Sequence, residues 1–151
     1  MIDFEIVFRV AKPVGLVFDL IADVSRYDQW VSQRSNFFIE NKLTSDGPIG
    51  VGTTYFDRLR YGGKSMGEIT QHDRPSNVRF HQQTFFGLSV FSADIDYFFK
   101  TQNKLTEITH HFAAKTHGLF RIAEPALSAV IRREREKTCE AIKQAIQSLE
   151  V

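Results

Sequence analysis

His110 is the residue whose type and surroundings most suggest chemistry. It occurs in residues 105–114, where Ile108, His110 and Phe112 fall on one side of an extended chain. A titratable imidazole on an apolar face can act as a polar anchor for a ligand or as a general acid or base. The alternative is a core histidine that is hydrogen-bonded to a neighbour such as Tyr97, because buried polar groups normally have partners.

Glu134 and Thr138 are two further polar residues along an apolar stripe near the end of the chain. The stripe recurs every three or four residues through Leu127, Ile131, Thr138, Ile142, Ala145 and Leu149. Glu134 also belongs to the charged run 132–137, and such a run is usually a solvated helix face. If the helix instead covers a hollow, Glu134 and Thr138 would face the ligand, with Arg58 or His110 as the partner of the carboxylate.

The sequence predicts no metal site and no cofactor. His110 and His111 are adjacent in a strand, so they point to opposite faces and cannot share an ion. The chain has one cysteine and no His-Glu-x-x-His helix. The loop at 47–52 lacks the Lys-Ser/Thr of a phosphate-binding loop and leads into a strand. Asp94 and Asp96 share the strand face opposite the aromatic one, so we interpret them as solubilising charges.

The charge balance argues against nucleic acid as a partner. The chain has 19 Lys and Arg residues against 18 Asp and Glu, for a net charge of +1, whereas phosphate neutralisation requires a basic excess or stripe. The single cysteine, Cys139, excludes an internal disulfide, and Asp3, Glu5 and Arg9 do not fit a secretory signal. No apolar run is long enough to span a bilayer. We therefore expect a cytoplasmic protein without integral membrane association.

The elements that must position these side chains begin with a strand and two short helices. Residues 3–10 alternate between an apolar and a more polar face, which is typical of a half-buried strand. Pro13 then suits the first turn of a helix, because its missing N–H costs nothing there. Asp23 or Ser25 can cap a second short helix that runs to about Trp30.

A series of short strands and one long helix complete the chain. Strands are expected at residues 35–45, 53–61, 65–72, 78–85, 90–100 and 105–114, with turn residues between them. The turn between the last two strands is expected at Gln102-Asn103. Consecutive hairpins favour an antiparallel meander. From Ala126 onward the spacing predicts an amphipathic helix of roughly seven turns.

Aromatic residues are abundant, and they can form either a solid core or the wall of a pocket. The chain has 14 Phe, 4 Tyr and 1 Trp, and such rings dominate buried area in either case. Alternation along the strands and the stripe on the final helix identify the side chains expected in a cavity. They are Phe80, Phe91, Ile95, Tyr97, His110, Phe112, Glu134 and Thr138.

Several short segments occur in an order that resembles a known family. They are Val10-Ala-Lys-Pro-Val14, Val17-Phe-Asp-Leu-Ile-Ala-Asp23, Tyr27-Asp-Gln-Trp30, Val51-Gly-Thr53, Asp73-Arg-Pro75, Lys104-Leu-Thr-Glu-Ile108 and Gly118. Together with the charged C-terminal helix they resemble the START-like or SRPBCC superfamily, in particular its polyketide cyclase/dehydrase and lipid-transport branch. The resemblance spans essentially the whole chain and implies one ligand-binding domain over residues 1–151.

The resemblance also implies a fold and a class of ligand. The fold is α+β of the helix-grip type, in which a curved antiparallel sheet of about six or seven strands wraps around the long C-terminal helix and encloses a hydrophobic cavity. Two short helices follow the first strand. Members of the family bind lipids, sterols, polyketides or other apolar small molecules, and a minority catalyse cyclisation or dehydration.

We therefore expect a protein that binds an apolar small molecule or lipid between the sheet and the C-terminal helix, as a carrier or a sensor. One alternative is an enzyme of the cyclase/dehydratase type, with His110 and either Glu134 or Tyr97 as acid/base groups. Another is a protein-interaction module that resembles activators of heat-shock-protein ATPases. The sequence leaves the ligand, the existence of an activity and the oligomeric state open.

Overall fold

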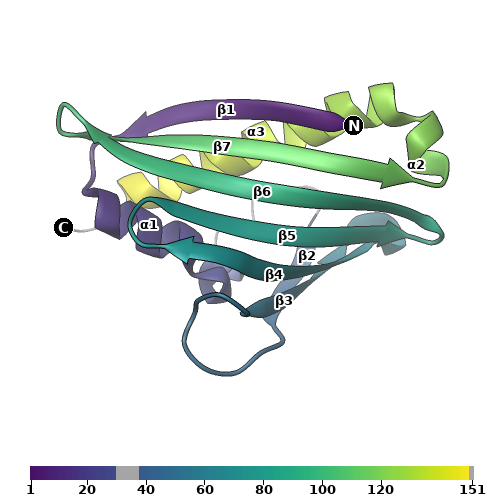
Figure 1. Cartoon of the computed structure of the whole chain (residues 1–151), viewed down its shortest axis with the longest axis horizontal. Helices are drawn as coiled ribbons and strands as arrows, with labels where there is room; N and C mark the ends of the chain where they lie inside the picture. Colours follow the sequence, from purple (N-terminus) through teal and green to yellow (C-terminus); the bar gives the residue numbers. More distant parts are fainter. Residues whose placement is uncertain (30–37, 150–151) are drawn as a thin grey trace.

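The computed structural model describes residues 1–29 and 38–149, and its strands form a seven-stranded sheet in which all neighbours are antiparallel (Figure 1). The order across the sheet is β1-β7-β6-β5-β4-β3-β2. The strands are β1 (Ile2–Val10), β2 (Phe38–Leu43), β3 (Thr54–Leu59), β4 (Lys64–Asp73), β5 (Asn77–Phe86), β6 (Ser89–Gln102) and β7 (Leu105–His117). The antiparallel meander expected from the sequence is confirmed. The first residues of the strand expected at 35–45 lie outside the described residues.

The hairpin of β6 and β7 lies between β1 and β5 in the sheet and sets the register of the candidate site. Its two-residue loop, Asn103-Lys104, has positive φ at both positions (49° and 68°), as a type I′ turn requires. The loop begins one residue later than the turn expected at Gln102. In the resulting register Tyr97 lies opposite His110, and both are buried on the inner face of the sheet.

The described residues form five helical segments: α1 (Val14–Ala22), the 3-10 helix η1 (Val24–Gln29), the short 3-10 helix η2 (Arg60–Gly62) between β3 and β4, α2 (Leu119–Ile122) and α3 (Glu124–Gln147). Pro13 precedes α1, as the sequence predicts. The expected end of the second helix, near Trp30, lies outside the described residues. Helix α3 starts before Ala126 because Pro125 occupies its first turn. No helix within 1–29 and 38–149 is both long and apolar enough to cross a membrane.

Helix α3 lies across one face of the sheet, with α1 beside its C-terminal part (Figure 1). Ile142 and Ile146 are fully buried there, as are Phe18 and Ile21 of α1. The Phe18 ring meets the Phe99 ring of β6 edge-on, with centroids 5.4 Å apart. This end of the helix is therefore sealed onto the sheet. The helix-grip architecture expected from the sequence is present, and the space under the other half of α3 forms the candidate site.

Candidate functional site

The N-terminal half of α3 lies over a cavity of about 200 Å³ between the helix and the inner face of the sheet. Most of its wall is apolar, with a few polar groups. The lining side chains are Leu59, Ser65, Gln82, Thr84, Phe86, Phe91, Ile95, Phe112, Phe120, Leu127, Val130, Ile131, Glu134, Arg135 and Thr138. An apolar concave site with few polar groups is the usual form of a small-molecule pocket.

The structure brings most of the residues that sequence reasoning selected to this cavity, but not all of them. Phe91, Ile95, Phe112, Glu134 and Thr138 line it. The other three lie next to it in the core and do not contribute to its wall: Phe80, Tyr97 and His110. The ring of Phe80 packs edge-on against the rings of Tyr55 and Tyr97, both with centroids 6.1 Å away.

Arg135 connects the cavity to this buried pair, Tyr97 and His110. Its Nη2 donates a hydrogen bond to the Tyr97 hydroxyl (2.9 Å), and its Nε donates one to His110 Nε2 (3.2 Å). The rings of Tyr97 and His110 lie against each other with centroids 4.7 Å apart. The guanidinium is half-buried and is held by two acceptors on neighbouring strands, so its orientation is fixed from both sides.

Both acceptors of Arg135 are neutral at physiological pH. Burial, with further contributions from the charge of Arg135 and from His111, lowers the pKa of His110 well below 6.5. Burial raises the pKa of Tyr97 to about 12, against the opposing effect of Arg135. A guanidinium only donates hydrogen bonds, so His110 Nε2 must accept and the ring proton is on Nδ1. Nδ1 is buried and has no partner among the described residues.

The sequence does not single out Arg135, because this residue belongs to the charged run 132–137, which is typical of a solvated helix face. A signal was nevertheless present in the helical spacing. Arg135 follows Ile131 by four residues and precedes Thr138 by three, so it lies on the same helix face as these two buried residues. The expected hydrogen bond between His110 and Tyr97 is replaced by one bond from Arg135 to each of them.

Glu134 and Thr138 both line the cavity. The hydrogen-bond and ion-pair partners that the structure describes for them lie on α3 itself, whereas the sequence suggested Arg58 or His110. Glu134 Oε1 lies 3.4 Å from Lys137 Nζ on the same helix. The Thr138 hydroxyl donates to the backbone carbonyl of Glu134 (3.0 Å). Arg58, which was considered as a partner of Glu134, instead pairs with Glu40 (3.3 Å). The hydroxyl of Thr138 is therefore satisfied within the helix.

A strip of polar side chains on β3, β4 and β5 forms part of the opposite wall. The Ser65 and Thr84 hydroxyl groups are 2.7 Å apart, and the Tyr55 hydroxyl donates to Gln82 Oε1 (2.9 Å). Ser65, Gln82 and Thr84 all line the cavity. Sequence reasoning missed these residues, although Gln82 and Thr84 alternate with Phe80 along β5. The cavity is thus amphipathic, with polar groups on the sheet as well as on α3.

The outer face of the sheet carries charged pairs rather than a catalytic pair of carboxylates. Asp94 is exposed and lies 2.8 Å from His81 Nδ1. Asp96 is buried, and Arg79 Nε donates to its carboxylate (2.8 Å). The interpretation of the two aspartates as solubilising charges fits Asp94, whereas Asp96 is covered by its arginine partner.

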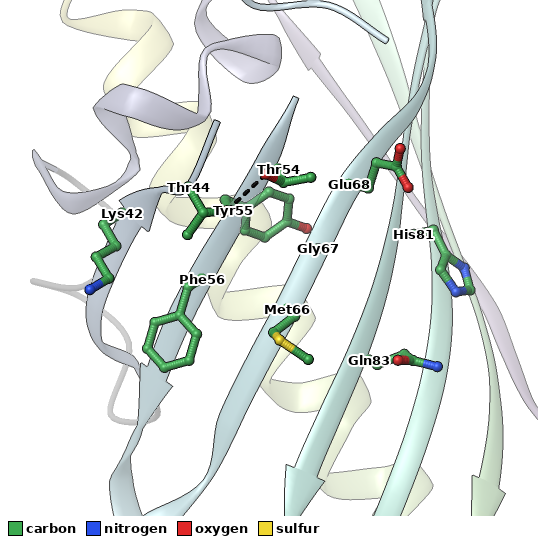
Figure 2. Close-up of a pocket in the computed structure, with 10 residues that line it drawn as sticks. All are labelled: Lys42, Thr44, Thr54, Tyr55, Phe56, Met66, Gly67, Glu68, His81 and Gln83. Carbon is green, nitrogen blue, oxygen red and sulfur yellow. Dashed lines mark hydrogen bonds between the residues drawn. The ribbon is translucent and has the colours of Figure 1, made fainter. Parts of the chain in front are cut away.

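The outer face also has a larger but more open hollow, of about 580 Å³, over strands β2 to β5 (Figure 2). Figure 2 shows Lys42, Phe56, Met66 and Gln83 as one row across these strands, in agreement with their pairing in the sheet. Lys42, Met66 and Gln83 are exposed. We place the candidate site in the smaller inner cavity, because that cavity is lined mainly by apolar side chains and contains a half-buried charge.

The side chains of the described residues form no cluster of three or more His, Cys, Asp or Glu that could hold a metal ion. His110 is instead engaged by Arg135. The chemistry that the inner cavity offers is apolar burial, several neutral polar contacts on the sheet wall, the carboxylate of Glu134 beside Lys137, and one guanidinium whose position is fixed by Tyr97 and His110.

The lowered pKa of His110 predicts a loss of stability in mild acid. The unfolded chain takes up a proton near pH 6.5 that the folded protein does not, so stability is retained above this pH and falls as the pH drops below it toward the folded pKa. The slope from this group is at most about 1.4 kcal/mol per pH unit. We expect His110→Gln, which keeps an acceptor for Arg135, to flatten the curve.

Urea unfolding of both proteins from pH 7.5 to 5 measures this effect. The difference between the two curves isolates His110, because the exposed pairs of His81 with Asp94 and of His111 with Asp3 are common to both proteins. Parallel curves over this range would show that His110 is protonated in the folded state as readily as in the unfolded chain.

Comparison with known proteins supports the fold assignment at the level of structure. No family model matches the sequence, and no curated protein matches it. A START superfamily protein from Mycobacterium smegmatis superposes with a TM-score of 0.74 at 9% identity, covering 98% of this chain and 99% of that one. The Zhui aromatase/cyclase from a Streptomyces species gives 0.69 at 16% identity, covering 96% and 93%. A conserved protein from Geobacillus kaustophilus gives 0.73 at 15% identity, covering 95% and 94%.

Proposed function

Starting from the fold that this chain shares with START superfamily and aromatase/cyclase proteins, we propose that it binds a hydrophobic small molecule in the cavity beneath α3. The observation that carries the proposal is the cavity itself. It has a volume of about 200 Å³ and a wall rich in Phe, Ile and Leu side chains, at the half of the helix that is not sealed onto the sheet. Burial of an apolar ligand there is favourable in proportion to the area removed from water.

A carrier or sequestering role agrees with the chemistry of the wall. The polar side chains on the sheet, such as Ser65, Thr84 and Gln82, are hydrogen-bonded to one another or to Tyr55. Hydroxyl and amide side chains are neutral donors and acceptors, so they can orient a ligand but do not act as acids or bases near pH 7. A lipid or another apolar molecule can therefore be held without any reaction.

An enzymatic role of the cyclase/dehydratase type is the alternative, and the fold of the Zhui aromatase/cyclase is the observation in its favour. His110 gives this alternative little support as an acid/base group. It is fully buried, it is not among the lining residues, and its Nε2 already accepts a hydrogen bond from Arg135. Tyr97, with a pKa of about 12, is a poor proton donor at pH 7. The role as a protein-interaction module stays a prediction.

A blocking substitution tests the binding proposal. Leu127 lines the cavity and is half-buried, so an indole at this position would occupy the space of the ligand. We expect Leu127→Trp to weaken the binding of prodan, a neutral apolar dye with two aromatic rings, by about tenfold or more, which corresponds to 1.4 kcal/mol. Fluorescence titration measures the affinity.

Ala129→Trp is the matched control, because Ala129 is exposed on the same helix and does not line the cavity. It should bind prodan as the original protein does. Circular dichroism establishes that both variants are folded. If the original protein does not bind the dye, or if Leu127→Trp binds it with unchanged affinity, the ligand does not occupy this cavity and the proposal is wrong.

A further inference from the structure

Arg135 places a permanent positive charge in the wall of an otherwise apolar cavity. Its guanidinium cannot lose its proton in a protein. Among residues 1–29 and 38–149, no carboxylate forms an ion pair with Arg135. A half-buried charge without a counter-charge is unfavourable, so an anionic group that enters the cavity would restore the balance.

The guanidinium of Arg135 also has N–H groups that can donate to a ligand. Its Nε donates a hydrogen bond to His110, and its Nη2 donates one of its two protons to Tyr97. In the described part of the chain, Nη1 and the second proton of Nη2 have no acceptor. Nη1 and Nη2 together form the fork that binds the two oxygens of a carboxylate, which is the preferred geometry for this pair of groups.

The residues that accept hydrogen bonds from Arg135 do not neutralise its positive charge. Both are neutral, because burial lowers the pKa of His110 and raises the pKa of Tyr97. Glu134, one of the two acidic residues adjacent to Arg135 in the sequence, also lines the cavity, and its carboxylate lies 3.4 Å from the ammonium group of Lys137. Lys137 offsets the charge of Glu134, whereas no carboxylate of the described residues forms an ion pair with the guanidinium of Arg135.

We propose that the ligand of this cavity is a small amphipathic acid, an apolar body with one carboxylate, and that Arg135 binds the carboxylate. This inference rests on the proposed function, because it concerns the ligand of the same cavity. The volume of about 200 Å³ is below the range of roughly 300–1,000 Å³ that is usual for drug-sized ligands. The apolar body is accordingly small, such as a medium-length alkyl chain or one or two aromatic rings.

Calorimetric titration with octanoate and with 1-octanol at pH 7.5 tests the inference, because the two probes share the alkyl chain and differ in charge. We expect octanoate to bind about tenfold more tightly or better, the gain of a charge-assisted bidentate contact. In Arg135→Met this preference should disappear, while the affinity for octanol changes by less than about threefold. Arg133→Met removes an exposed arginine from the same helix and should keep the preference.

A measurement on the original protein alone covers the case in which Arg135→Met does not fold. The pKa of octanoate labelled with carbon-13 at the carboxyl group can be followed by NMR in the bound state. Contact with a guanidinium should lower this pKa relative to that of free octanoate. An unchanged or raised pKa would overturn the inference.

The outcomes separate this inference from the proposed function. If prodan or octanol binds and octanoate has no advantage, or if its advantage survives in Arg135→Met, the cavity binds apolar ligands but Arg135 does not select acids. If prodan binds and neither eight-carbon probe does, the assignment of a small amphipathic acid is wrong and apolar binding stands. If none of the three compounds binds, both the inference and the proposed function are wrong.

Discussion

Ile142→Ala is expected to lower the free energy of unfolding by about 3–5 kcal/mol, in the upper part of the range for such truncations. Ile142 is fully buried where α3 is sealed onto the sheet and α1. Removal of its side chain leaves a new void in a close-packed region, so the cost of the void adds to the lost transfer free energy. Urea unfolding at pH 7.5 measures the change.

The matched substitution is Ile131→Ala, eleven residues earlier on the same helix. Ile131 is also buried, but its side chain borders the cavity. Truncation there enlarges an existing space, so we expect about 2 kcal/mol, the transfer term alone. Equal losses at the two positions would mean that α3 is packed uniformly along its length, and the cavity would then not exist in solution.

Gly67→Ala is expected to destabilise the protein by about 1–3 kcal/mol or more, because the inner face of β4 has no room for a side chain at this position. A Cβ at Gly67 would lie 2.1 Å from Cζ of the Tyr55 ring and 2.3 Å from its hydroxyl oxygen. Figure 2 shows the Tyr55 ring beside Gly67. The ring is buried, and its hydroxyl donates to Gln82, which lines the cavity. A shift of Tyr55 would therefore disturb the polar wall as well as the core.

Gly50→Ala is the control, since a Cβ at Gly50 would have no atom within 4 Å. We expect its free energy of unfolding to stay within about 0.5 kcal/mol of the original value. If the losses of Gly67→Ala and Gly50→Ala agree within this margin, the Tyr55 ring is free to move, and its hydrogen bond to Gln82 does not fix the wall of the cavity.

The fold was largely predictable, because the spacing of apolar residues is a local property of the chain. Apolar residues recur at every second position in a half-buried strand and at every third or fourth position in an amphipathic helix. Alternation along residues 90–100 and 105–114 predicted the inner faces of β6 and β7, and Pro13 predicted the start of α1. The least accurate expectations concerned boundaries: the turn after β6 begins at Asn103, and α3 starts before Ala126. The ends of strands and helices depend on single hydrogen bonds and on the first turn of a helix. Hydrophobic periodicity is a property of many residues, so it does not locate these ends to the residue.

The candidate site was predictable only in part. The sequence determined which side chains face inward, so Phe91, Ile95, Phe112, Glu134 and Thr138 were selected before their positions were known. Burial of apolar surface constrains the strand positions strongly. A shift of one residue in the strand register would move every inward-facing side chain to the outer face of the sheet. The sequence also limited the chemistry, since it offered one imidazole, His110, on the apolar face of residues 105–114.

The contacts of the polar groups depend on how α3 packs on the sheet. In the sequence, Arg135 is one of several charges on an amphipathic helix, and His110 is isolated among apolar residues. The long arginine side chain reaches across the space between α3 and the sheet to Tyr97 and His110, which lie on strands distant in sequence. The length and direction of such a side chain depend on how the helix sits on the sheet, and no local periodicity encodes that placement. The same placement leaves the cavity beneath α3, whose wall includes Arg135.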